Sequence, residues 1–324
     1  MTNHPAVDTV IERIVKDQIG GAADTAREVM AALSQVATDS RVTRVGDLYQ
    51  ELDAAAVAIL RICPSFAPPI NVLHMMMGAI EEAVEKGATV ADAKTSLLST
   101  RKSFEETMAT AFEKIANIGA ELIKDGDKVF MFSMTSSVWK VLRRAKEQGK
   151  KFAVMVTEAR PANEGLWTVD EMNKSGIPVE VSVDACLAEM VADCNIAFAG
   201  VDAVAADGSV FNKSGTLLTA LAAREYGVPF YFVTDTLKFD TATLWGLPFR
   251  SEPIKYEEVM QDKKYASGVK VTGMLFDTTP PNLITAIVTE RGPIPPTACV
   301  SVLWNMKLSK RISDLIPKWA HNEL

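Results

Sequence analysis

Along the first hundred or so residues, apolar side chains recur every three or four positions, which is the spacing of amphipathic helices. Residues 8–18, for example, place Val10, Ile11 and Ile14 on one face. The same spacing, interrupted at glycine and proline, predicts further helices at 23–36, 44–61, 71–87, 90–98 and 103–124. The pattern therefore predicts a helical N-terminal domain.

After Asp127 the pattern changes to short apolar runs that alternate with helical segments. This alternation is typical of strand–helix–strand units in a parallel sheet whose two faces are covered. The expected strands lie at 129–132, 152–156, 178–182, 195–199 and 229–233. We therefore predict an α/β protein with a helical N-terminal domain over 1–123 and a parallel-sheet domain over 124–324.

The composition is that of a soluble globular protein and excludes several function classes. The chain has 324 residues and a formal net charge of -7, with 34 Lys and Arg against 41 Asp and Glu. That balance does not favour nucleic acid as a partner, although two or three cations suffice for a phosphate pocket. The sequence shows neither a leader pattern nor an apolar stretch long enough to span a membrane, so we expect a cytoplasmic protein with no membrane contact.

Cysteine and histidine are too sparse for several kinds of catalytic site. The four cysteines show no Cys-x-x-Cys spacing, and only three histidines occur. We therefore expect neither a metal site nor a Ser-His-Asp triad. His74, in an apolar run, is better explained as a hydrogen-bonded core residue than as a lone base. No glycine-rich nucleotide-binding motif occurs, and we expect no cofactor.

Polar residues follow the first two expected strands, at the end of a parallel sheet where ligands bind. Ser133, Thr135 and Ser136 lead into a helix. They are candidates either for an anion site built with the helix-start amides or for simple helix capping. Glu158 and Arg160 follow the second strand and are suited to pairing with each other or to steadying a neighbouring loop. Arg160 is also a candidate ligand contact.

The later strands are followed by a carboxylate and two cations. Asp202 follows an apolar strand, so its carboxylate is expected to face the crevice at the sheet edge. Asn212 and Lys213 precede Gly215 and a long apolar helix, where an amide side chain, an ammonium and helix-start amides can share a phosphate. Lys238 supplies a second cation. A turn that only starts the helix is the alternative, but the convergence of acid and base favours a ligand site.

Several long motifs, taken in their order along the chain, resemble one protein family. They are Thr157–Pro161, Gly200–Asp202, Asp207–Thr216, Lys238-Phe239 and Phe276–Glu290. The resemblance is to the superfamily that joins the α, β and δ subunits of translation initiation factor 2B to methylthioribose-1-phosphate isomerase and ribose-1,5-bisphosphate isomerase. It implies a helical N-terminal domain, a Rossmann-like C-terminal domain, and a homodimer or larger homo-oligomer formed through the latter.

In the isomerases of this family, an aspartate and a cysteine interconvert an aldose 1-phosphate and a ketose 1-phosphate. The resemblance places that aspartate at Asp202 and the sugar-phosphate contacts at Asn212, Lys213 and Lys238. The family cysteine, however, falls on Ser133, which is a much poorer base near neutral pH than a thiol.

The resemblance also shows two departures in the N-terminal part. Gly20-Gly21-Ala22 stands where the isomerases have the Arg-Gly-Ala that holds phosphate, and Cys63 stands where they have a second arginine. Losing two guanidinium contacts weakens phosphate binding on that side. A small-molecule ligand with a single phosphate therefore fits the retained groups better than a doubly phosphorylated sugar.

Three hypotheses follow from these residues. The first is a sugar-phosphate isomerase of altered specificity, with Asp202 as acid and base. The second is a non-catalytic sugar-phosphate-binding or regulatory protein of the initiation factor 2B α-subunit type. The third is a structural subunit of a translation-factor-like assembly. The retained Asp202, Asn212, Lys213 and Lys238 favour the first, because a purely structural subunit has less reason to keep them.

Overall fold

The computed structural model describes residues 4–16, 18–19, 22–63, 67–260 and 268–320. The chain divides into two compact units, which we call the helical unit and the sheet unit. The helical unit comprises Met1–Thr110, Leu237–Pro248 and Ser301–Leu324, and the sheet unit comprises Ala111–Thr236 and Phe249–Val300. The domain limits that the sequence suggests, 1–123 and 124–324, stay predictions.

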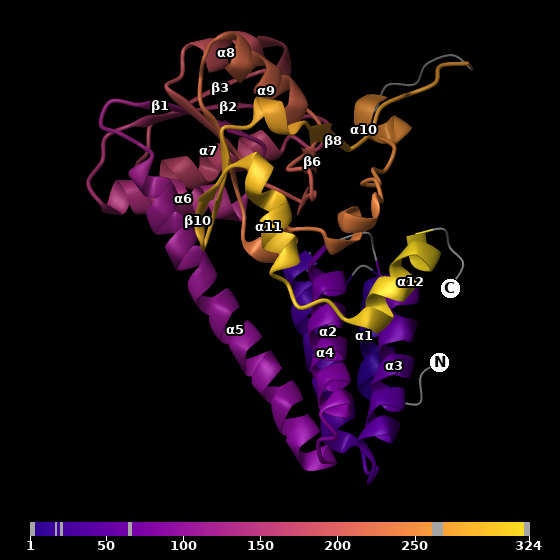
Figure 1. Cartoon of the computed structure of the whole chain (residues 1–324). Coiled ribbons are helices and arrows are strands. Elements are labelled where there is room, and N and C mark those ends of the chain that lie inside the picture. The colour runs from indigo at the N-terminus through magenta and orange to yellow at the C-terminus, as the bar shows by residue number, and fades with distance from the viewer. Residues whose placement is uncertain (1–3, 17, 20–21, 64–66, 261–267, 321–324) are drawn as a thin grey trace. The chain divides into compact units, whose positions relative to one another are not determined.

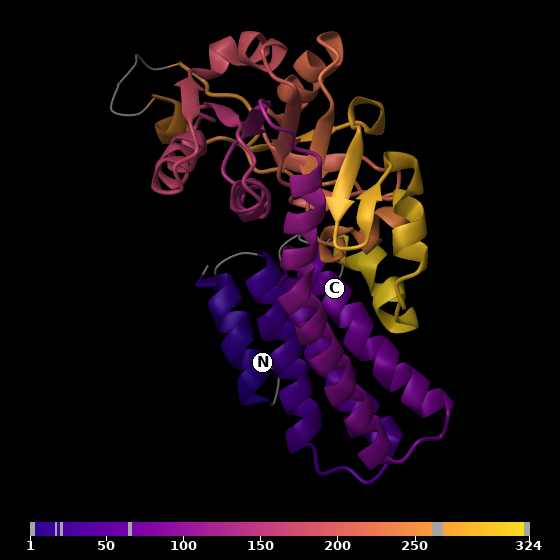
Figure 2. The same cartoon turned by 90° about the vertical axis from the view of Figure 1, so that its left-hand side faces the viewer.

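The helical unit consists of long helices that run alongside one another (Figures 1 and 2). The helix α4 is its centre, because it packs against α2, α3 and α12 and is buried along most of its length. The helices of this unit are α1 (Pro5–Val15), α2 (Ala22–Asp39), α3 (Val45–Ile62), α4 (Ala67–Glu85), the first part of α5 (Val90–Glu121) and α12 (Lys310–Ala320). The predicted N-terminal helices are thus confirmed.

One helix differs from the prediction. The segments 90–98 and 103–124 were expected as two helices, but the structure has the single helix α5 over both. The polar residues between them contain no glycine or proline, and the Arg101–Glu105 pair spans one turn there. Such a pair supports a continuous helix, because residues four apart are neighbours on the helix surface.

Two later segments complete the helical unit by hydrogen bonding to α4. Asn71 is buried and donates from Nδ2 to the carbonyls of Leu237 (2.7 Å) and Phe239 (2.8 Å). The Glu81 carboxylate accepts from the amides of Lys310 (2.9 Å) and Arg311 (3.0 Å), at the start of α12. Amides at a helix start have no partner within the helix, so a carboxylate there satisfies them and complements the helix dipole.

His74 is a core histidine, as its apolar surroundings in the sequence predict. It is 1% exposed, its Nδ1 accepts from the Ser309 amide at 3.2 Å, and its ring stacks on Trp245 with centroids 6.4 Å apart. Burial lowers the pKa of His74 to about 4, although the hydrogen bond from Ser309 opposes that shift. The imidazole is therefore neutral at physiological pH.

The buried His74 makes stability depend on pH. Its folded pKa of about 4 lies below the ordinary histidine value of 6.5, so the unfolded chain binds the proton first and stability falls as pH drops from 6.5 to 4. Asp240 acts in the opposite sense, because burial raises its pKa from 3.8 to about 6 and stability falls as pH rises through that window.

We expect His74→Asn to change the pH dependence of unfolding by about 3 kcal/mol between pH 7 and 4. Asparagine keeps an acceptor for the Ser309 amide but does not titrate, so the loss of stability that His74 causes between pH 6.5 and 4 disappears and no longer offsets the opposite effect of Asp240. Urea unfolding at pH 4, 5, 6 and 7 measures this slope. Asp240→Asn should change the slope in the opposite direction. Plots of unfolding free energy against pH that run parallel to the wild-type plot would contradict the assignment of these effects to His74 and Asp240.

Within its described residues the sheet unit holds a seven-stranded sheet in the order β10-β9-β7-β4-β1-β2-β3. Neighbouring strands are parallel except for β10, which is antiparallel to β9 (Figure 2, yellow). The strands are β1 (Lys128–Phe132), β2 (Ala153–Thr157), β3 (Val179–Ser182), β4 (Ile196–Ala199), β7 (Phe230–Val233), β9 (Ala286–Thr289) and β10 (Gly292–Ile294). The five predicted strands and the α/β fold are confirmed.

Both faces of this sheet are covered by helices. Val129 and Met131 of β1 pack with the end of α5 and with α6 (Ser136–Glu147) and α7 (Glu164–Lys174). On the other face, the Phe132 ring lies against Gly215, just before α9 (Thr216–Glu225), which packs on α8 (Leu187–Ala192). Burial on both faces explains why the strands appear in the sequence as continuous apolar runs.

Part of the segment predicted as a loop after Asp202 is a second, antiparallel sheet. In the described residues it has three strands, β5 (Ala203–Val204), β6 (Val210–Lys213) and β8 (Phe276–Thr279). None of these strands is a continuous apolar run in the sequence, because β6 and β8 contain polar residues and β5 has only two residues, and β8 is also distant in sequence. The remaining helices are α10 (Tyr256–Met260) and α11 (Cys299–Trp304), and none of the described helices is long and apolar enough to cross a membrane.

Candidate functional site

The candidate site lies at the carboxyl ends of β1 and β4. The six parallel strands lie in the order β3-β2-β1-β4-β7-β9. From β1 the chain first adds strands on one side and then, from β4, on the other, so the topological switch point falls between β1 and β4. Ligands of open α/β sheets bind at such a point. The two loops that follow the strands touch, because a Cβ added to Gly200 would lie 2.6 Å from Thr135 Oγ1. Asp202 is half-buried in the second of these loops, and its amide donates to the Phe211 carbonyl at 2.9 Å.

Ser133 is the first residue after β1 and has an unusual backbone. Its φ of 61° is in the left-handed region, and the residue is only 4% exposed. Its hydroxyl donates to the carboxylate of Glu164 at 2.5 Å. Non-glycine residues held in this conformation cluster at active sites and ligand clamps.

Glu164 joins Ser133 to Lys213. Its second carboxylate oxygen lies 2.9 Å from Lys213 Nζ, and the ammonium is also 5.1 Å from the centre of the Phe276 ring. The three side chains come from the end of β1, the start of α7 and the end of β6. We call this hydroxyl–carboxylate–ammonium chain the Ser133–Glu164–Lys213 network.

The packing of α7 explains how Glu164 reaches this position. Asn163 takes a left-handed conformation with φ of 58°, which turns the chain into the helix. Gly165 then lies so close to the end of β2 that an added Cβ would be 1.7 Å from the Thr157 carbonyl oxygen. Only glycine permits this approach, and it brings the first turn of α7 beside the end of β2 and the loop after β1.

The Arg160 side chain contacts a neighbouring segment, which agrees with one of the three roles that its sequence position suggests. Its guanidinium donates to the carbonyls of Glu258 (3.3 Å) and Val259 (3.1 Å) in α10. The backbone amides of Ala159 and Arg160 donate to Asp184 at 2.9 and 2.8 Å. The structure therefore places the Arg160 side chain on α10 and not in the Ser133–Glu164–Lys213 network.

The start of α9 does not offer its amides to a phosphate, contrary to expectation. The amides of Gly215 (2.7 Å) and Leu217 (3.1 Å) donate to the carboxylate of Asp277 on β8. Burial raises the pKa of Asp277, while those same amides oppose the shift. Asn212 is also engaged, because its Nδ2 donates to Thr216 Oγ1 at 2.9 Å. An internal carboxylate thus takes the anion position that the sequence suggests for a ligand.

The start of α6 has a different arrangement. Thr135 is its N-cap residue, and Ser136 is the first helical residue. The Thr135 hydroxyl bonds to the Ser137 hydroxyl (3.0 Å), which also donates to the Val233 carbonyl (2.9 Å). Among the described residues, the Thr135 side chain makes no capping bond to the helix amides. Helix capping was one of the two roles predicted for this segment. The hydroxyl of the N-cap residue, Thr135, does not have that role.

The other predicted ligand residues belong to the helical unit. Ala22 begins α2, Cys63 follows α3, and Lys238 is half-buried at the end of a short 3₁₀ helix (Thr236–Lys238). Gly20 and Gly21 lie outside the described residues. The structure brings Ser133 and Lys213 together through Glu164, and it brings the loops of Thr135 and Asp202 into contact.

The thiols are poor candidates for acid–base chemistry. Burial raises the pKa values of Cys63, Cys194 and Cys299 to about 12. Cys186 follows β3, which is separated from β1 by β2. Across the described ranges, no three His, Cys, Asp or Glu side chains gather in a way that holds a metal ion. The acid–base groups at the sheet edge are therefore carboxylates, a hydroxyl and an ammonium.

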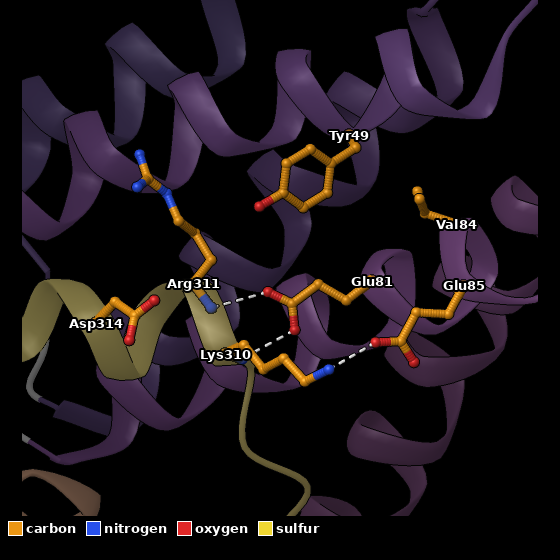
Figure 3. Close-up of a pocket in the computed structure, with 7 residues that line it drawn as sticks. All are labelled: Tyr49, Glu81, Val84, Glu85, Lys310, Arg311 and Asp314. Atoms are coloured by element: carbon orange, nitrogen blue, oxygen red, sulfur yellow. Dashed lines mark hydrogen bonds and ion pairs between the residues drawn. The ribbon is translucent and has the colours of Figure 1, made fainter.

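A pocket of about 320 Å³ in the helical unit is lined by charged residues (Figure 3). Its cations are already paired, because Lys310 binds Glu85 at 2.8 Å and Arg311 binds Asp53 through two hydrogen bonds of 2.6 and 3.1 Å. Glu81 accepts from the first amides of α12. These charges hold α12 against α3 and α4, which is a structural role.

Two residues of the site were missed by reasoning from sequence, Glu164 and Asp277. Glu164 follows the Arg160-Pro161 pair and precedes a glycine, which marks a helix start but not its partners. Asp277 lies in one of the motifs that carry the family resemblance, yet its role depends on the pairing of β8 with β6. Neither contact is visible before the strands are paired.

Comparison with known proteins gives concordant results. Residues 18–296 match the family described as Initiation factor 2 subunit family. A protein of Thermococcus kodakarensis named ribose 1,5-bisphosphate isomerase is 31% identical over 313 residues, which are 94% of this chain and 97% of that protein. The structure of the Pyrococcus horikoshii translation initiation factor eIF-2B superposes with a TM-score of 0.69 at 28% identity, covering 91% of this chain and 99% of that one.

A third comparison concerns the fold alone. The 5-methylthioribose 1-phosphate isomerase of Pyrococcus horikoshii superposes with a TM-score of 0.68 at 22% identity. The match covers 92% of this chain and 87% of that one. The same fold therefore occurs in proteins named for isomerisation and in proteins named for translation initiation.

Proposed function

Because the chain belongs to the initiation factor 2 subunit family, we propose that it is a sugar-phosphate isomerase that interconverts an aldose 1-phosphate and a ketose 1-phosphate. The relative named ribose 1,5-bisphosphate isomerase matches nearly the whole chain and supports this reaction class. The observation that supports the proposal most strongly is that acidic, hydroxyl and basic side chains are grouped near the switch point between β1 and β4. Asp202 follows β4, which pairs with β1, and Ser133, the first residue after β1, is joined through Glu164 to Lys213.

The reaction moves one hydrogen from C2 to C1 and converts the C2 hydroxyl to a carbonyl. The ring oxygen must also take up a proton as its bond to C1 breaks. A single carboxyl group can serve both proton transfers, giving its proton to the ring oxygen and then taking one from O2, so that it returns to its starting form. We assign this role to Asp202, because it is half-buried at the sheet edge where the sugar is expected.

The phosphate position follows from which groups are already engaged. Asp277 binds the amides at the start of α9, so that position is less suited to a second anion. The start of α6 lies next to Ser133, and its N-cap hydroxyl bonds to Ser137 and not to the helix amides. We therefore place the phosphate at the start of α6, where amides and the Thr135 and Ser136 hydroxyls favour an anion. Lys213 then binds an oxygen of the sugar.

Turnover by the purified full chain tests the proposal. We expect at least one member of a panel of tetrose and pentose 1-phosphates to be converted to the matching ketose 1-phosphate, followed by ¹³C NMR of C1 and C2. The reverse reaction from the ketose should reach the same equilibrium ratio, because an enzyme does not change it. An absence of conversion in both directions across the whole panel would overturn the proposed reaction.

A regulatory, non-catalytic sugar-phosphate-binding protein is the second candidate. It is favoured by the likeness to the Pyrococcus horikoshii translation initiation factor eIF-2B and by a hydroxyl, not a thiol, at residue 133. This candidate predicts a rise in melting temperature with sugar phosphate far above its Kd, without chemical change. Conversion of any sugar phosphate by the pure protein would remove it.

Self-association through the sheet unit stays part of the proposal. The helix α9 leaves Leu218 and Leu221 about half exposed. Apolar side chains on the surface of one helix are suited to burial against a second copy, because such a contact removes them from water. A homodimer is therefore the smallest assembly that we expect.

A further inference from the structure

The carboxylate of Glu164 is held at both of its oxygens. Ser133 Oγ donates to Oε2 at 2.5 Å, and Lys213 Nζ lies 2.9 Å from Oε1. A base within hydrogen-bond reach of a hydroxyl, and oriented in turn by a third group, is the arrangement that characterises proton-transfer sites. The arrangement raises the question of which member of the network meets the substrate.

The exposure of the three residues indicates which of them meets the substrate. Ser133 is buried, whereas Glu164 and Lys213 are half-buried. Glu164 and Lys213 are therefore more accessible from the solvent, from which a ligand enters, than Ser133 is. The left-handed backbone of Ser133 directs its hydroxyl onto the carboxylate, which is the geometry of a residue that positions another.

We propose that Glu164 is the base that moves the hydrogen between C2 and C1, and that Ser133 and Lys213 are its positioning residues. This inference rests on the proposed isomerase function and deepens it. It assigns the catalytic role at the end of β1 to a carboxylate on α7, in a chain whose residue 133 is a serine.

The transfer balances in two steps. In the first, Glu164 takes the C2 hydrogen as a proton and the electron pair forms a C1–C2 double bond. The C1–O4 bond breaks, its electron pair stays on O4, and O4 takes the proton of Asp202. In the second, protonated Glu164 returns its proton to C1 while O2–H gives its proton to the Asp202 carboxylate, leaving a C2 carbonyl. Both carboxyl groups are restored, and no oxidant or reductant is consumed.

Lys213 links this step to substrate binding. In the structure the ammonium is bound to Glu164 Oε1. A substrate oxygen that takes a place on Nζ weakens that contact and frees one carboxylate oxygen for the C2 hydrogen. The site therefore holds its base in place before the substrate arrives and releases it on binding.

Glu164→Gln tests the assignment, measured on a sugar 1-phosphate that the wild type converts, prepared with hydrogen or deuterium at C2. Glutamine keeps an acceptor for Ser133 but cannot take the proton, so kcat should fall by about 100-fold or more. The ratio of kcat for the hydrogen and deuterium substrates should rise, because the C2 transfer becomes rate-limiting. A merely structural role would not move this ratio. Glu171→Gln, in the same helix where the half-buried carboxylate pairs with Lys174, is the matched control and should behave as the wild type.

Ser133→Ala is the companion variant, and it covers the case in which Glu164→Gln does not fold. If Ser133 only positions the base, its loss should lower kcat by about tenfold, well short of the loss at Glu164, and should also raise the isotope ratio. A larger loss for Ser133→Ala than for Glu164→Gln would overturn the inference, as would a Glu164→Gln enzyme with unchanged kcat. A wild-type protein that converts no sugar phosphate would instead remove the proposed function, and this inference with it.

Discussion

We expect the replacement of Asp202 with asparagine to lower kcat for the aldose 1-phosphate of the proposed reaction by about 10²- to 10⁴-fold, which is the usual contribution of a general acid and base. Asparagine has the same shape and keeps the backbone bond from residue 202 to Phe211, so the fold around the site is retained. It can neither protonate the ring oxygen nor take the proton of O2. KM should therefore change much less than kcat.

The matched control is Asp207→Asn, five residues further along. Asp207 is exposed in the turn between β5 and β6, where its side chain accepts from the Ser209 amide at 2.9 Å, and asparagine can make the same bond. Steady-state kinetics on the two variants separates a local charge effect from a chemical role. Equal losses in both, or a fully active Asp202→Asn enzyme, would show that Asp202 is not the acid and base.

Gly165→Ala should destabilise the protein by about 3 kcal/mol or more, the upper end of what overpacking costs. The added Cβ would lie 1.7 Å from the Thr157 carbonyl oxygen and 2.9 Å from the Thr157 carbonyl carbon. Both atoms are backbone, so no side-chain rotation relieves the clash, and either β2 or α7 must move. Because Glu164 is the adjacent residue, the same movement should also disturb its bond to Ser133.

Gly46→Ala provides the comparison for that substitution. Gly46 and Gly165 are each the second residue of a helix, but a Cβ at Gly46 would meet nothing within 4 Å. Alanine there should leave stability unchanged or raise it by up to about 1 kcal/mol, because it restricts the unfolded chain. Urea and thermal unfolding measure both variants. A Gly165→Ala protein as stable as Gly46→Ala would mean that the end of β2 adapts at little cost.

Much of the fold was predictable because its signals are local. The N-terminal helices repeat apolar residues every three or four positions, and the central strands of the sheet are continuous apolar runs. The strands β5, β6 and β8 escaped prediction because none of them is a continuous apolar run: β5 has two residues, and β6 and β8 mix apolar with polar residues. The break expected within α5 is absent because no residue there prevents a helix from continuing.

The site was predictable only in part, for a related reason. Asp202 and Lys213 could be singled out because each stands next to a recognisable strand or helix start. Glu164 and Asp277 could not, since their partners Ser133 and Gly215 lie 31 and 62 residues away in the sequence. Their roles arise only when α7 is set against β2 and when β8 pairs with β6.

The contacts of α12 have a consequence for the order in which the protein is made. The amide that binds His74 belongs to Ser309, which is 235 residues later in the chain. At 5–20 residues per second, a ribosome reaches Ser309 roughly 12 to 50 s after His74. Throughout that interval Asp53, His74 and Glu81 lack the partners that Ser309, Lys310 and Arg311 later supply. The helices made first are therefore completed last, after nearly the whole chain has been translated.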